Sequence, residues 1–381
     1  MVLVASLLRL LLLPLPPTLS DDTLRYVWDG RLVASGFNPY RHAPEAEELM
    51  ALRDPLWERM PHKEVPTVYP PLALAVFTAA VALPVPLVGV KILITLLELC
   101  GVFFLLRLAA ARGLPPGRAA WYAWCPLTSL EVAGMGHVDG LLVAAQVAAV
   151  WLLVRRRPVA AGLCAAAGVL AKLVPLVALP MWGRQSGRPA RFLAAAVALV
   201  ALAVAPVVVS VGGVPPGLVR YGVSWEFNGP VYEPLYRLLD DAGAVDAVKG
   251  GLDALKEGTG HHELWNRVYP FVYPQLLAKL VLLALFAVLF LRSWRCADPV
   301  VGSGRLFAAV LLSMATFYPW YLLWILPWAA LVRHRAWLAL AAWIQMAYLP
   351  ALLGWQYFPW VYLAIWVPFF FLLGTTRWST D

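Results

Sequence analysis

Long apolar runs separated by short polar gaps fill most of this sequence. They cover residues 2–15, 69–87, 88–106, 119–133, 141–154, 159–182, 192–211, 271–291, 306–332, 337–353 and 360–373. A helix that crosses a bilayer needs about 20 predominantly apolar residues, and several runs reach that length. The pattern therefore predicts an all-α polytopic membrane protein. Because no internal repeat or low-complexity linker divides the chain, we expect a single domain over residues 1–381.

The first apolar run, residues 2–15, can be read as a signal peptide or as a transmembrane helix. It lacks a charged n-region and a small-residue cleavage site, and it carries Arg9 within the run. These features favour a first transmembrane helix. The run is short for a full span, which leaves open a native start further upstream.

The composition excludes a soluble enzyme. Hydrophobic residues make up 61% of the chain and charged residues 14%, with a mean hydropathy of +0.72, whereas soluble domains average about 25% charged residues. The net charge of +8 comes mostly from Arg in the gaps between apolar runs. That distribution is typical of cytoplasmic membrane anchors, so we expect membrane lipids and no nucleic acid as partners. The four cysteines have no disulfide or metal spacing, and we expect free thiols.

Six Arg clusters set the predicted orientation, because positive residues favour the cytoplasmic side of a membrane. They lie at residues 107–118, 155–157, 184–191, 292–305, 333–335 and 377. All six fall on one side if runs 159–182 and 306–332 are each two short helices. The first pair would break near Lys172 and Pro175, and the second near Tyr318 and Pro319.

This threading also requires residues 69–87 to form a juxtamembrane helix instead of a full span. It then gives about twelve transmembrane helices, with both termini in the cytoplasm. Two long external loops follow from it, residues 20–68 and 212–270. Counting residues 69–87 as a span would place several Arg clusters outside.

The same threading gathers most other polar residues on the external side. Ionisable residues at membrane depth are costly, so such a gathering indicates a functional site. Ordinary loop polarity accounts for residues 45–64. It does not account for Glu131, His137 or Lys172, which lie at the ends of apolar helices.

Several short motifs, taken in order along the chain, resemble those of a known enzyme family. They are Asp22-Thr-Leu-Arg25-Tyr26-Val-Trp28-Asp29-Gly30, Gly36-Phe-Asn38-Pro39-Tyr40, Tyr69-Pro70-Pro71-Leu72-Ala73, Trp124-Cys-Pro126-Leu127 with Glu131 and Gly136-His137-Val-Asp139, Lys172-Leu-Val-Pro175, and Pro319-Trp320-Tyr321-Leu-Leu-Trp324. The ordered set resembles bacterial polyprenyl-phosphate-mannose-dependent mannosyltransferases of the GT-C fold, similar to glycosyltransferase family 87. In one departure, Cys125-Pro126-Leu127 stands where the family usually has Asn-Pro-Leu.

The resemblance implies a GT-C-type integral membrane glycosyltransferase with juxtamembrane helices in its first external loop. Such an enzyme transfers a hexose, usually mannose, from a polyprenyl-phosphate-linked donor to a lipid or cell-envelope glycan acceptor. Transfer proceeds with inversion on the extracytoplasmic face of the bacterial plasma membrane. The alternative is a polytopic transporter or lipid or glycolipid flippase without transferase activity. Many transporters have pseudo-repeated halves and midplane charges, and neither is clear in this sequence.

Inverting transfer needs a base that takes the proton of the acceptor hydroxyl as it attacks the anomeric carbon. A carboxylate at the exit of the first helix suits this role. By match to the first-loop motif the catalytic candidate is Asp22, with Asp21 second because the pair leaves the register open by one residue. In the alternative interpretation, either carboxylate caps a helix that opens at Thr23.

The leaving group is a lipid phosphate, so a cation should meet its developing negative charge. Lys172, set between two short helices on the external side, is the principal candidate. Arg25 and Lys91 could assist it. The alternative for Lys172 is a lysine at a helix end whose ammonium reaches the polar interface.

The remaining polar and aromatic residues of the external face are candidate substrate ligands. Carboxylates and imidazole are also ordinary metal ligands, but a lipid donor with one phosphate does not need a metal as nucleotide donors do. We therefore expect no cofactor, with a divalent metal left open. The expected substrate-binding residues are Tyr26, Trp28, Asp29, Asn38, Glu131, His137, Asp139, Asn228, His261, Trp320 and Tyr321.

Overall fold

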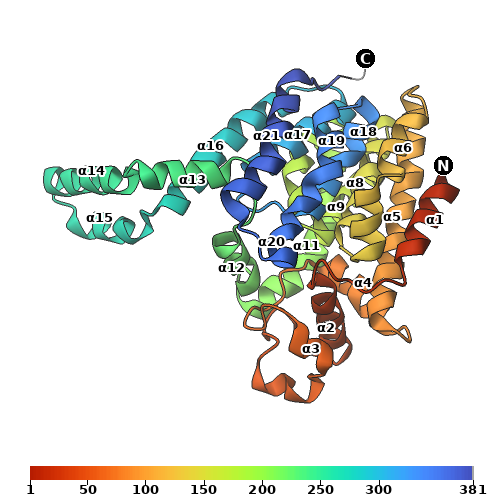
Figure 1. Cartoon of the computed structure of the whole chain (residues 1–381), viewed down its shortest axis with the longest axis horizontal. Coiled ribbons are helices and arrows are strands. Elements are labelled where there is room, and N and C mark those ends of the chain that lie inside the picture. Colours follow the sequence, from red (N-terminus) through yellow and green to blue (C-terminus); the bar gives the residue numbers. More distant parts are fainter. Residues whose placement is uncertain (380–381) are drawn as a thin grey trace. The chain divides into compact units, whose positions relative to one another are not determined.

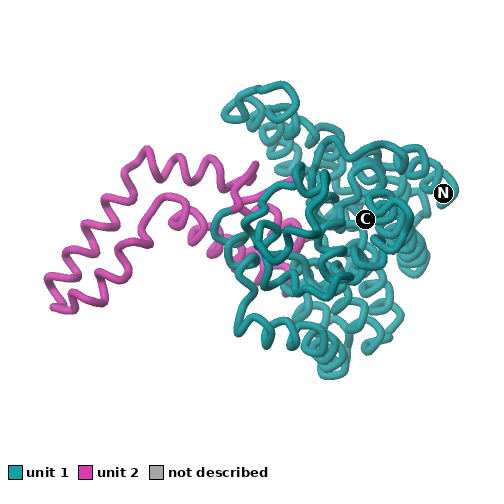
Figure 2. Tube along the Cα trace, turned by 90° about the horizontal axis from the view of Figure 1, so that it is seen from below, with its two compact units in different colours: residues 1–224, 296–304, 319–381 teal, residues 225–295, 305–318 magenta. Residues whose placement is uncertain are grey.

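A computed structural model describes residues 1–379, and within them the chain is helical without a β-strand. Residues 1–224, 296–304 and 319–379 form one compact unit, and residues 225–295 and 305–318 form a second (Figure 2). Helix α17 (Pro299–Ser313) passes from the first unit to the second.

The first unit holds most of the helices (Figure 1). They are α1 (Val2–Leu12), α2 (Asp22–Ala34), α3 (Pro55–Arg59), α4 (Pro71–Val81), α5 (Pro86–Ala111), α6 (Gly117–Ala123), α7 (Pro126–Ser129), α8 (Asp139–Val154), α9 (Pro158–Ala171), α10 (Leu179–Gln185), α11 (Pro189–Val211), α12 (Pro216–Ser224), α18 (Leu326–Val332), α19 (Arg335–Trp343), α20 (Leu349–Leu353) and α21 (Tyr362–Thr375). Short turns connect several of them, namely η1 (Glu47–Leu52), η2 (Leu130–Gly134), η3 (Val174–Ala178), η5 (Pro319–Trp324), η6 (Ile344–Tyr348) and η7 (Tyr357–Val361).

Among the described residues, five helical stretches are long and apolar enough to cross a membrane. They are Pro86–Ala111, Pro189–Val211, Pro274–Trp294, Arg335–Leu353 and Tyr357–Thr375. Shorter apolar helices accompany them at Val2–Leu12, Pro71–Val81, Asp139–Val154, Pro158–Ala171 and Pro299–Ser313. The all-helical membrane character is confirmed, whereas the expected count of about twelve spans stays a prediction.

Both predicted helix breaks are present. Helix α9 ends at Ala171, Lys172 is extended, and the chain continues through η3 into α10. Pro175 lies in η3, where its missing N–H and its ring would disrupt a continuous helix. In the same way α17 ends at Ser313 and the chain resumes as η5, which opens at Pro319.

Two expected segments have different bounds in the structure. The helix expected over residues 69–87 is α4, which ends at Val81, and α5 begins at Pro86 after a turn. The juxtamembrane position of α4 stays a prediction. The expected external loop 212–270 is largely helical, since it contains α12 and the second unit's first three helices. Its many charges suggested a loop, but they alternate with apolar residues at helical spacing.

Helices α5, α8, α9 and α11 pack side by side in sequence order and form the centre of the first unit. Helix α1 is tied to α5 by a fully buried ion pair. Arg9 donates to both oxygens of Glu98 at 2.7 and 2.8 Å, and its third nitrogen donates to the carbonyls of Ala5 and Ala123. A buried charge must be paired in this way to be tolerated.

Helix α2 packs closely against α4. A Cβ on Gly30 would lie 2.5 Å from the carbonyl oxygen of Phe77, so only glycine permits this approach. On the other side of α2, Leu24, Trp28 and Leu32 form a hydrophobic cluster with residues of the first loop. These contacts fix the orientation of α2, which carries Asp22 in its first turn.

The second unit contains α13 (Tyr232–Asp241), α14 (Ala244–Thr259), α15 (His262–Val268), the turn η4 (Tyr269–Phe271) and α16 (Pro274–Trp294). Helix α13 packs against α16 through a cluster of Tyr232, Ala278 and Leu282. Lys279 of α16 forms an ion pair with Glu226 at 2.8 Å.

Candidate functional site

Asp22 lies in the first turn of α2, and its side chain is about one-third exposed at 34%. The hydroxyl of Tyr26, one helical turn away, lies 3.4 Å from its carboxylate. Asp21 occupies the N-cap position of α2, is exposed, and makes no side-chain capping bond. The capping interpretation is therefore wrong for Asp21, and of the two carboxylates it is Asp22 that lies among other polar groups.

His137 lies between two carboxylates in the same unit. Its Nδ1 is 3.7 Å from Oδ2 of Asp22 and its Nε2 is 3.3 Å from Oε2 of Glu131, and the ring is completely buried. Within residues 1–379, neither ring nitrogen makes a hydrogen bond of good geometry. Trp320 stacks on the imidazole with a centroid distance of 3.9 Å. The hydroxyl of Tyr348 donates to Glu131 at 3.0 Å, so a row of polar groups runs from Asp22 to Tyr348.

The loop that carries His137 is held by α2 itself. The chain leaves η2 through Met135, whose carbonyl accepts a hydrogen bond from the hydroxyl of Thr23. Gly136 follows with a φ of +77°, and a Cβ there would lie 3.1 Å from the Thr23 hydroxyl oxygen. Glycine allows both this left-handed conformation and the close contact. The same helix therefore positions Asp22 and the loop that faces it.

Lys172 lies at the break after α9, next to the start of α8. Its ammonium donates to both oxygens of Asp139 at 2.8 and 3.0 Å. The indole of Trp324 donates to the same carboxylate. The ammonium also lies 4.5 Å from the ring centroid of Tyr321 and 5.1 Å from that of Trp324, and its side chain remains 20% exposed. Lys172 is thus a partly accessible cation held by a carboxylate and two aromatic rings.

The groups around Asp22 shift the pKa of its carboxyl in opposite directions. Burial raises the pKa of the Asp22 carboxyl above its ordinary value, while His137 and Lys172 lower this pKa in part. Asp139 raises this pKa. A carboxyl with a raised pKa is a stronger base in its ionised form, as general base catalysis requires.

The other two phosphate candidates are engaged elsewhere. Arg25 donates to Asp29 and to the carbonyl of Val65, both at 2.8 Å, and is 8% exposed. The ammonium of Lys91 is directed at the carbonyls of Leu12, Leu13 and Leu15. An ammonium has three N–H donors, so Lys91 has none left for a phosphate in this arrangement.

The remaining first-loop candidates are largely structural in their contacts. Trp28 is 3% exposed within its hydrophobic cluster, and Asp29 accepts from Arg25 and from the Thr67 hydroxyl. Tyr26 stacks on Phe77 with its hydroxyl toward Asp22. The amide of Asn38 donates to Ser210 at 2.9 Å.

Two candidates, Asn228 and His261, belong to the second unit. Asn228 is 1% exposed and donates to the carbonyl of Phe317 at 3.1 Å. His261 is exposed at the N-cap position of α15. The site described above is built from first-unit residues without them.

Sequence reasoning missed Tyr348 and gave Trp324 no role. Both donate to site carboxylates, Tyr348 to Glu131 and Trp324 to Asp139. Trp324 stood in a quoted motif, whereas Tyr348 lies in an apolar run without a local signal. Within residues 1–379, no three His, Cys, Asp or Glu side chains converge as metal ligands would.

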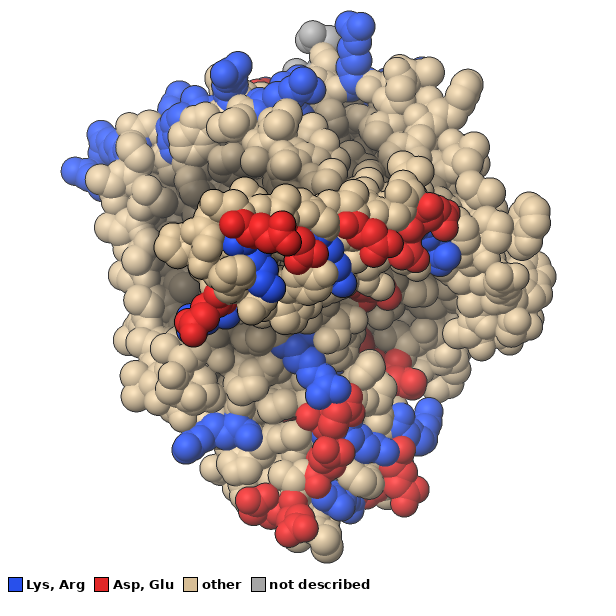
Figure 3. Space-filling model, turned by 90° about the vertical axis from the view of Figure 1, so that its left-hand side faces the viewer, with Lys and Arg blue, Asp and Glu red and all other residues tan. Residues whose placement is uncertain are grey.

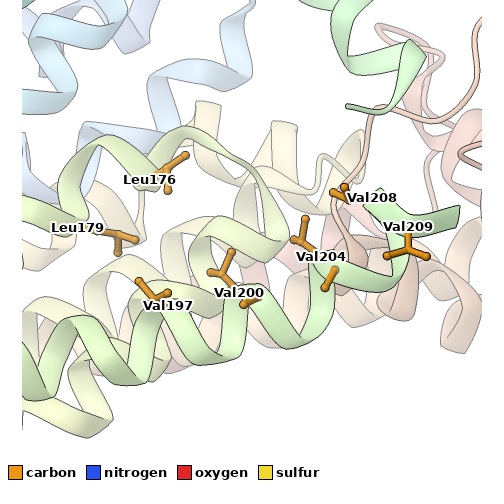
Figure 4. A pocket seen from close by; sticks show the side chains of 9 residues that line it. Leu176, Leu179, Val197, Val200, Val204, Val208 and Val209 are labelled. Carbon is orange, nitrogen blue, oxygen red and sulfur yellow. The ribbon is translucent and has the colours of Figure 1, made fainter. Parts of the chain in front are cut away.

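An open apolar pocket of about 370 Å³ lies along α11, close in the chain to Lys172. Figure 4 shows side chains from α11 and from the segment after Lys172 lining it. Its lining residues are Leu176, Leu179, Val197, Val200, Ala201, Val204, Ala205, Val208 and Val209. All are aliphatic, so the pocket suits a hydrocarbon chain and offers no polar specificity.

Residues 3–187 match a family model described as alpha-(1->6)-mannopyranosyltransferase, N-terminal domain, of the MptA_B family. The matched segment contains Asp22, Glu131, His137, Asp139 and Lys172. No curated protein and no solved structure matches the chain at a significant level. The family match confirms the resemblance to mannosyltransferases that the motifs indicated.

Proposed function

We propose that this chain, whose residues 3–187 match a mannosyltransferase domain, transfers a hexose from a polyprenyl-phosphate-linked donor to an acceptor hydroxyl. The acceptor is a lipid or a cell-envelope glycan, and the anomeric configuration inverts. One observation carries the proposal beyond the match. The partly exposed Asp22 carboxylate and the partly exposed Lys172 ammonium are linked through the contacting rings of His137, Trp320 and Tyr321.

In this proposal Asp22 is the general base. Its carboxylate takes the proton of the acceptor hydroxyl as the hydroxyl oxygen attacks the anomeric carbon. His137, 3.7 Å away and backed by Glu131, stabilises the ionised carboxylate before the reaction. As charge leaves Asp22 on protonation, His137 and Glu131 can still pair with each other, so the row of groups stays compensated.

Lys172 meets the departing lipid phosphate. Two of its N–H donors are held by Asp139, and the third is available to a phosphate oxygen. Charge-assisted hydrogen bonds of this kind strengthen as negative charge develops on the leaving oxygen. Tyr321 and Trp324 present aromatic faces beside the ammonium and can border the sugar.

The aliphatic pocket along α11 supports a donor with a long apolar chain. Leu176 and Leu179 begin it shortly after Lys172, so a chain attached to a phosphate at Lys172 could continue along α11 (Figure 4). Such a chain comes from lipid that is as apolar as the pocket, so the pocket contributes packing contacts and no transfer free energy from water. A soluble nucleotide-sugar donor would have no use for this pocket.

We also propose that the site faces the extracytoplasmic side of a bacterial plasma membrane, with both termini in the cytoplasm. Within the first unit, both ends of the described chain lie in the upper half of Figure 1, whereas α2 and α3 lie at its lower edge. On the face that Figure 3 draws, Lys and Arg gather along the upper edge, and acidic and basic side chains mix along the lower edge. This distribution is the one that cytoplasmic positive charge favours.

The test is donor turnover by the purified chain. We expect it to consume polyprenyl-phosphate-mannose when a panel of envelope lipids supplies the acceptor. The Asp22→Asn variant should reduce turnover by about 10²–10⁴-fold, the usual contribution of a general base. Asp21→Asn is the matched control, because Asp21 is exposed beside it and should be replaceable without loss.

Three results would reject the assignment. Normal turnover in Asp22→Asn would remove the base, and loss in Asp21→Asn alone would move it by one residue. Movement of labelled lipid across the bilayer without formation of a glycosidic bond would favour the flippase alternative.

A further inference from the structure

The helical hairpin of α14 and α15 in the second unit has no buried residue. In this unit, drawn in magenta in Figure 2, α14 and α15 form the arm that extends from α13 and α16. The two helices join at Gly260, which has a φ of +68°. A helix that is exposed all round and still strongly patterned needs a partner for its apolar face.

The pattern on α14 is amphipathic. Val245, Val248, Leu252 and Leu255 follow one another at intervals of three and four residues, so they form one stripe. Val248 is 39% exposed and Leu255 is 48% exposed. The charged residues of α14 occupy the remaining surface, and at 100° per residue the lysines border the stripe while the acidic residues lie further from it. They are Asp246, Lys249, Asp253, Lys256 and Glu257.

Helix α15 folds back on α14 and leaves Val248 and Leu255 of the stripe exposed, while Val245 and Leu252 are partly covered. The indole of Trp265 donates to the hydroxyl of Thr259 at 3.0 Å, and the ammonium of Lys249 lies 5.2 Å from the ring centroid of Tyr269. Leu264 and Phe271 remain 55% and 62% exposed. The hairpin therefore keeps large apolar side chains on the surface of α14 and of the segment from α15 to η4.

The chain next to the hairpin indicates what covers these side chains. Helix α16 begins at Pro274, three residues after η4, and is long and apolar enough to cross a membrane. Its side chains Leu280 and Leu283 are 53% and 62% exposed, as expected for a surface in contact with lipid. The connection carries Tyr269 and Tyr273, and tyrosine favours the membrane–water interface.

We propose that α14 and α15 lie in the lipid–water interface beside α16, with the apolar stripe of α14 buried among the lipid headgroups and upper acyl chains. Lysines that border the stripe can extend their ammonium groups toward water while their methylenes stay in lipid. The segment 244–268 carries three basic and four acidic side chains. Attraction to anionic lipid is therefore not what holds it, and binding rests on apolar area.

The test places nitroxide labels on the full chain in phosphatidylcholine bilayers. Single cysteines replace Val248 and Leu255 on the stripe, and Asp246 and Asp253 away from it, after the four native cysteines are changed to serine. Collision with oxygen and with a water-soluble nickel chelate gives the depth of each label. We expect the stripe labels about 5–10 Å below the headgroup surface and the two controls in water. Adding anionic lipid should leave these depths unchanged.

Other depth patterns would overturn the proposal. If all four labels report water, the hairpin lies in solution. If all four are buried, the hairpin is fully inserted in the bilayer. Stripe labels shielded from both reagents would indicate a protein partner or a second copy.

A second measurement needs no substitution. Hydroxyl-radical footprinting of the unaltered protein in nanodiscs should leave Leu255 and Leu264 protected despite their exposure in the structure, and free oxidation of both would also reject the interfacial position. Neither measurement depends on transferase activity, so this inference can fail independently of the proposed function.

Discussion

Two polar clusters in the first unit differ in how completely their groups are paired. Around Arg9 the pairing is complete: both oxygens of Glu98 accept from the guanidinium, two carbonyls accept from its third nitrogen, and both side chains are fully buried. Around Asp22 it is incomplete. The carboxylate is one-third exposed, and the nitrogens of His137 lie 3.3 and 3.7 Å from carboxylates without a hydrogen bond of good geometry.

The comparison separates two uses of costly polar groups. A buried charge with all its partners fixes helices against one another and has no capacity for a ligand. A cluster with unfilled hydrogen-bonding capacity that is open on one side can accept a substrate hydroxyl. Charge within an apolar run therefore indicates function only when its pairing is incomplete.

The largest effect is expected when one partner is removed from the fully paired cluster around Arg9. Arg9→Met leaves Glu98 buried without its cation, and we expect a loss of about 3–5 kcal/mol in the free energy of unfolding. The double variant Arg9→Met/Glu98→Leu should recover most of this loss, because an apolar pair of similar volume has no charge to desolvate. Denaturant unfolding in micelles measures both. A single variant as stable as the wild type would contradict the structural role.

Substitutions in the incompletely paired cluster around Asp22 and Lys172 should lower turnover instead of stability. Lys172→Met is expected to lower kcat/KM by about 10²-fold or more, which is about 2.7 kcal/mol of transition-state stabilisation. Lys172→Arg should be only partly tolerated, since guanidinium is larger and planar. Lys279 is a matched control, because it is ion-paired and equally exposed at 20%. If Lys279→Met loses as much as Lys172→Met, the effect is not specific to a phosphate.

An intermediate effect is expected at Tyr348, whose buried hydroxyl donates to Glu131 at the end of the row of polar groups that begins at Asp22. Tyr348→Phe removes the hydroxyl that donates to Glu131. A hydrogen bond to a charged group is worth about 1.5–3 kcal/mol, and we expect a stability loss of this size with Asp22 still functional. Thermal unfolding and donor turnover, measured on the same preparation, separate the two. Turnover lost without any loss of stability would place Tyr348 in contact with substrate.

The smallest expected effect is a shift in the pH dependence of kcat/KM. Only the ionised form of Asp22 can accept a proton, so activity rises as pH rises through its pKa. Burial raises that pKa, so the acidic limb should lie above the ordinary value for aspartate, near 3.9. His137 opposes the effect of burial, so His137→Gln should move the limb to still higher pH. A limb that stays in place would exclude His137 as an influence on Asp22.

The local features of the fold could be predicted from sequence. Pro175 and Pro319 marked both helix breaks, because proline cannot continue the hydrogen bonding of a helix. The quoted motifs contain Asp22, Glu131, His137, Asp139 and Lys172. In the structure His137 lies between Asp22 and Glu131, and Lys172 pairs with Asp139, while their role as a site stays a prediction.

What could not be predicted is pairing over long separations. Nothing near Lys91 in sequence indicates that it binds carbonyls at the end of α1, and nothing near Tyr348 indicates Glu131. The helices of segment 212–270 were missed because that segment is polar as well as apolar, and average hydropathy conceals the periodicity.

The contact between Gly30 and the carbonyl of Phe77 has a consequence for mutational tolerance. Every other amino acid begins with a Cβ, which would lie 2.5 Å from that oxygen, so substitution must displace α2 from α4. A random library selected for activity should therefore return glycine at position 30 as consistently as aspartate at position 22. Counting tolerated substitutions would rank the two positions equally, although Gly30 permits a close helix contact and Asp22 is the proposed general base.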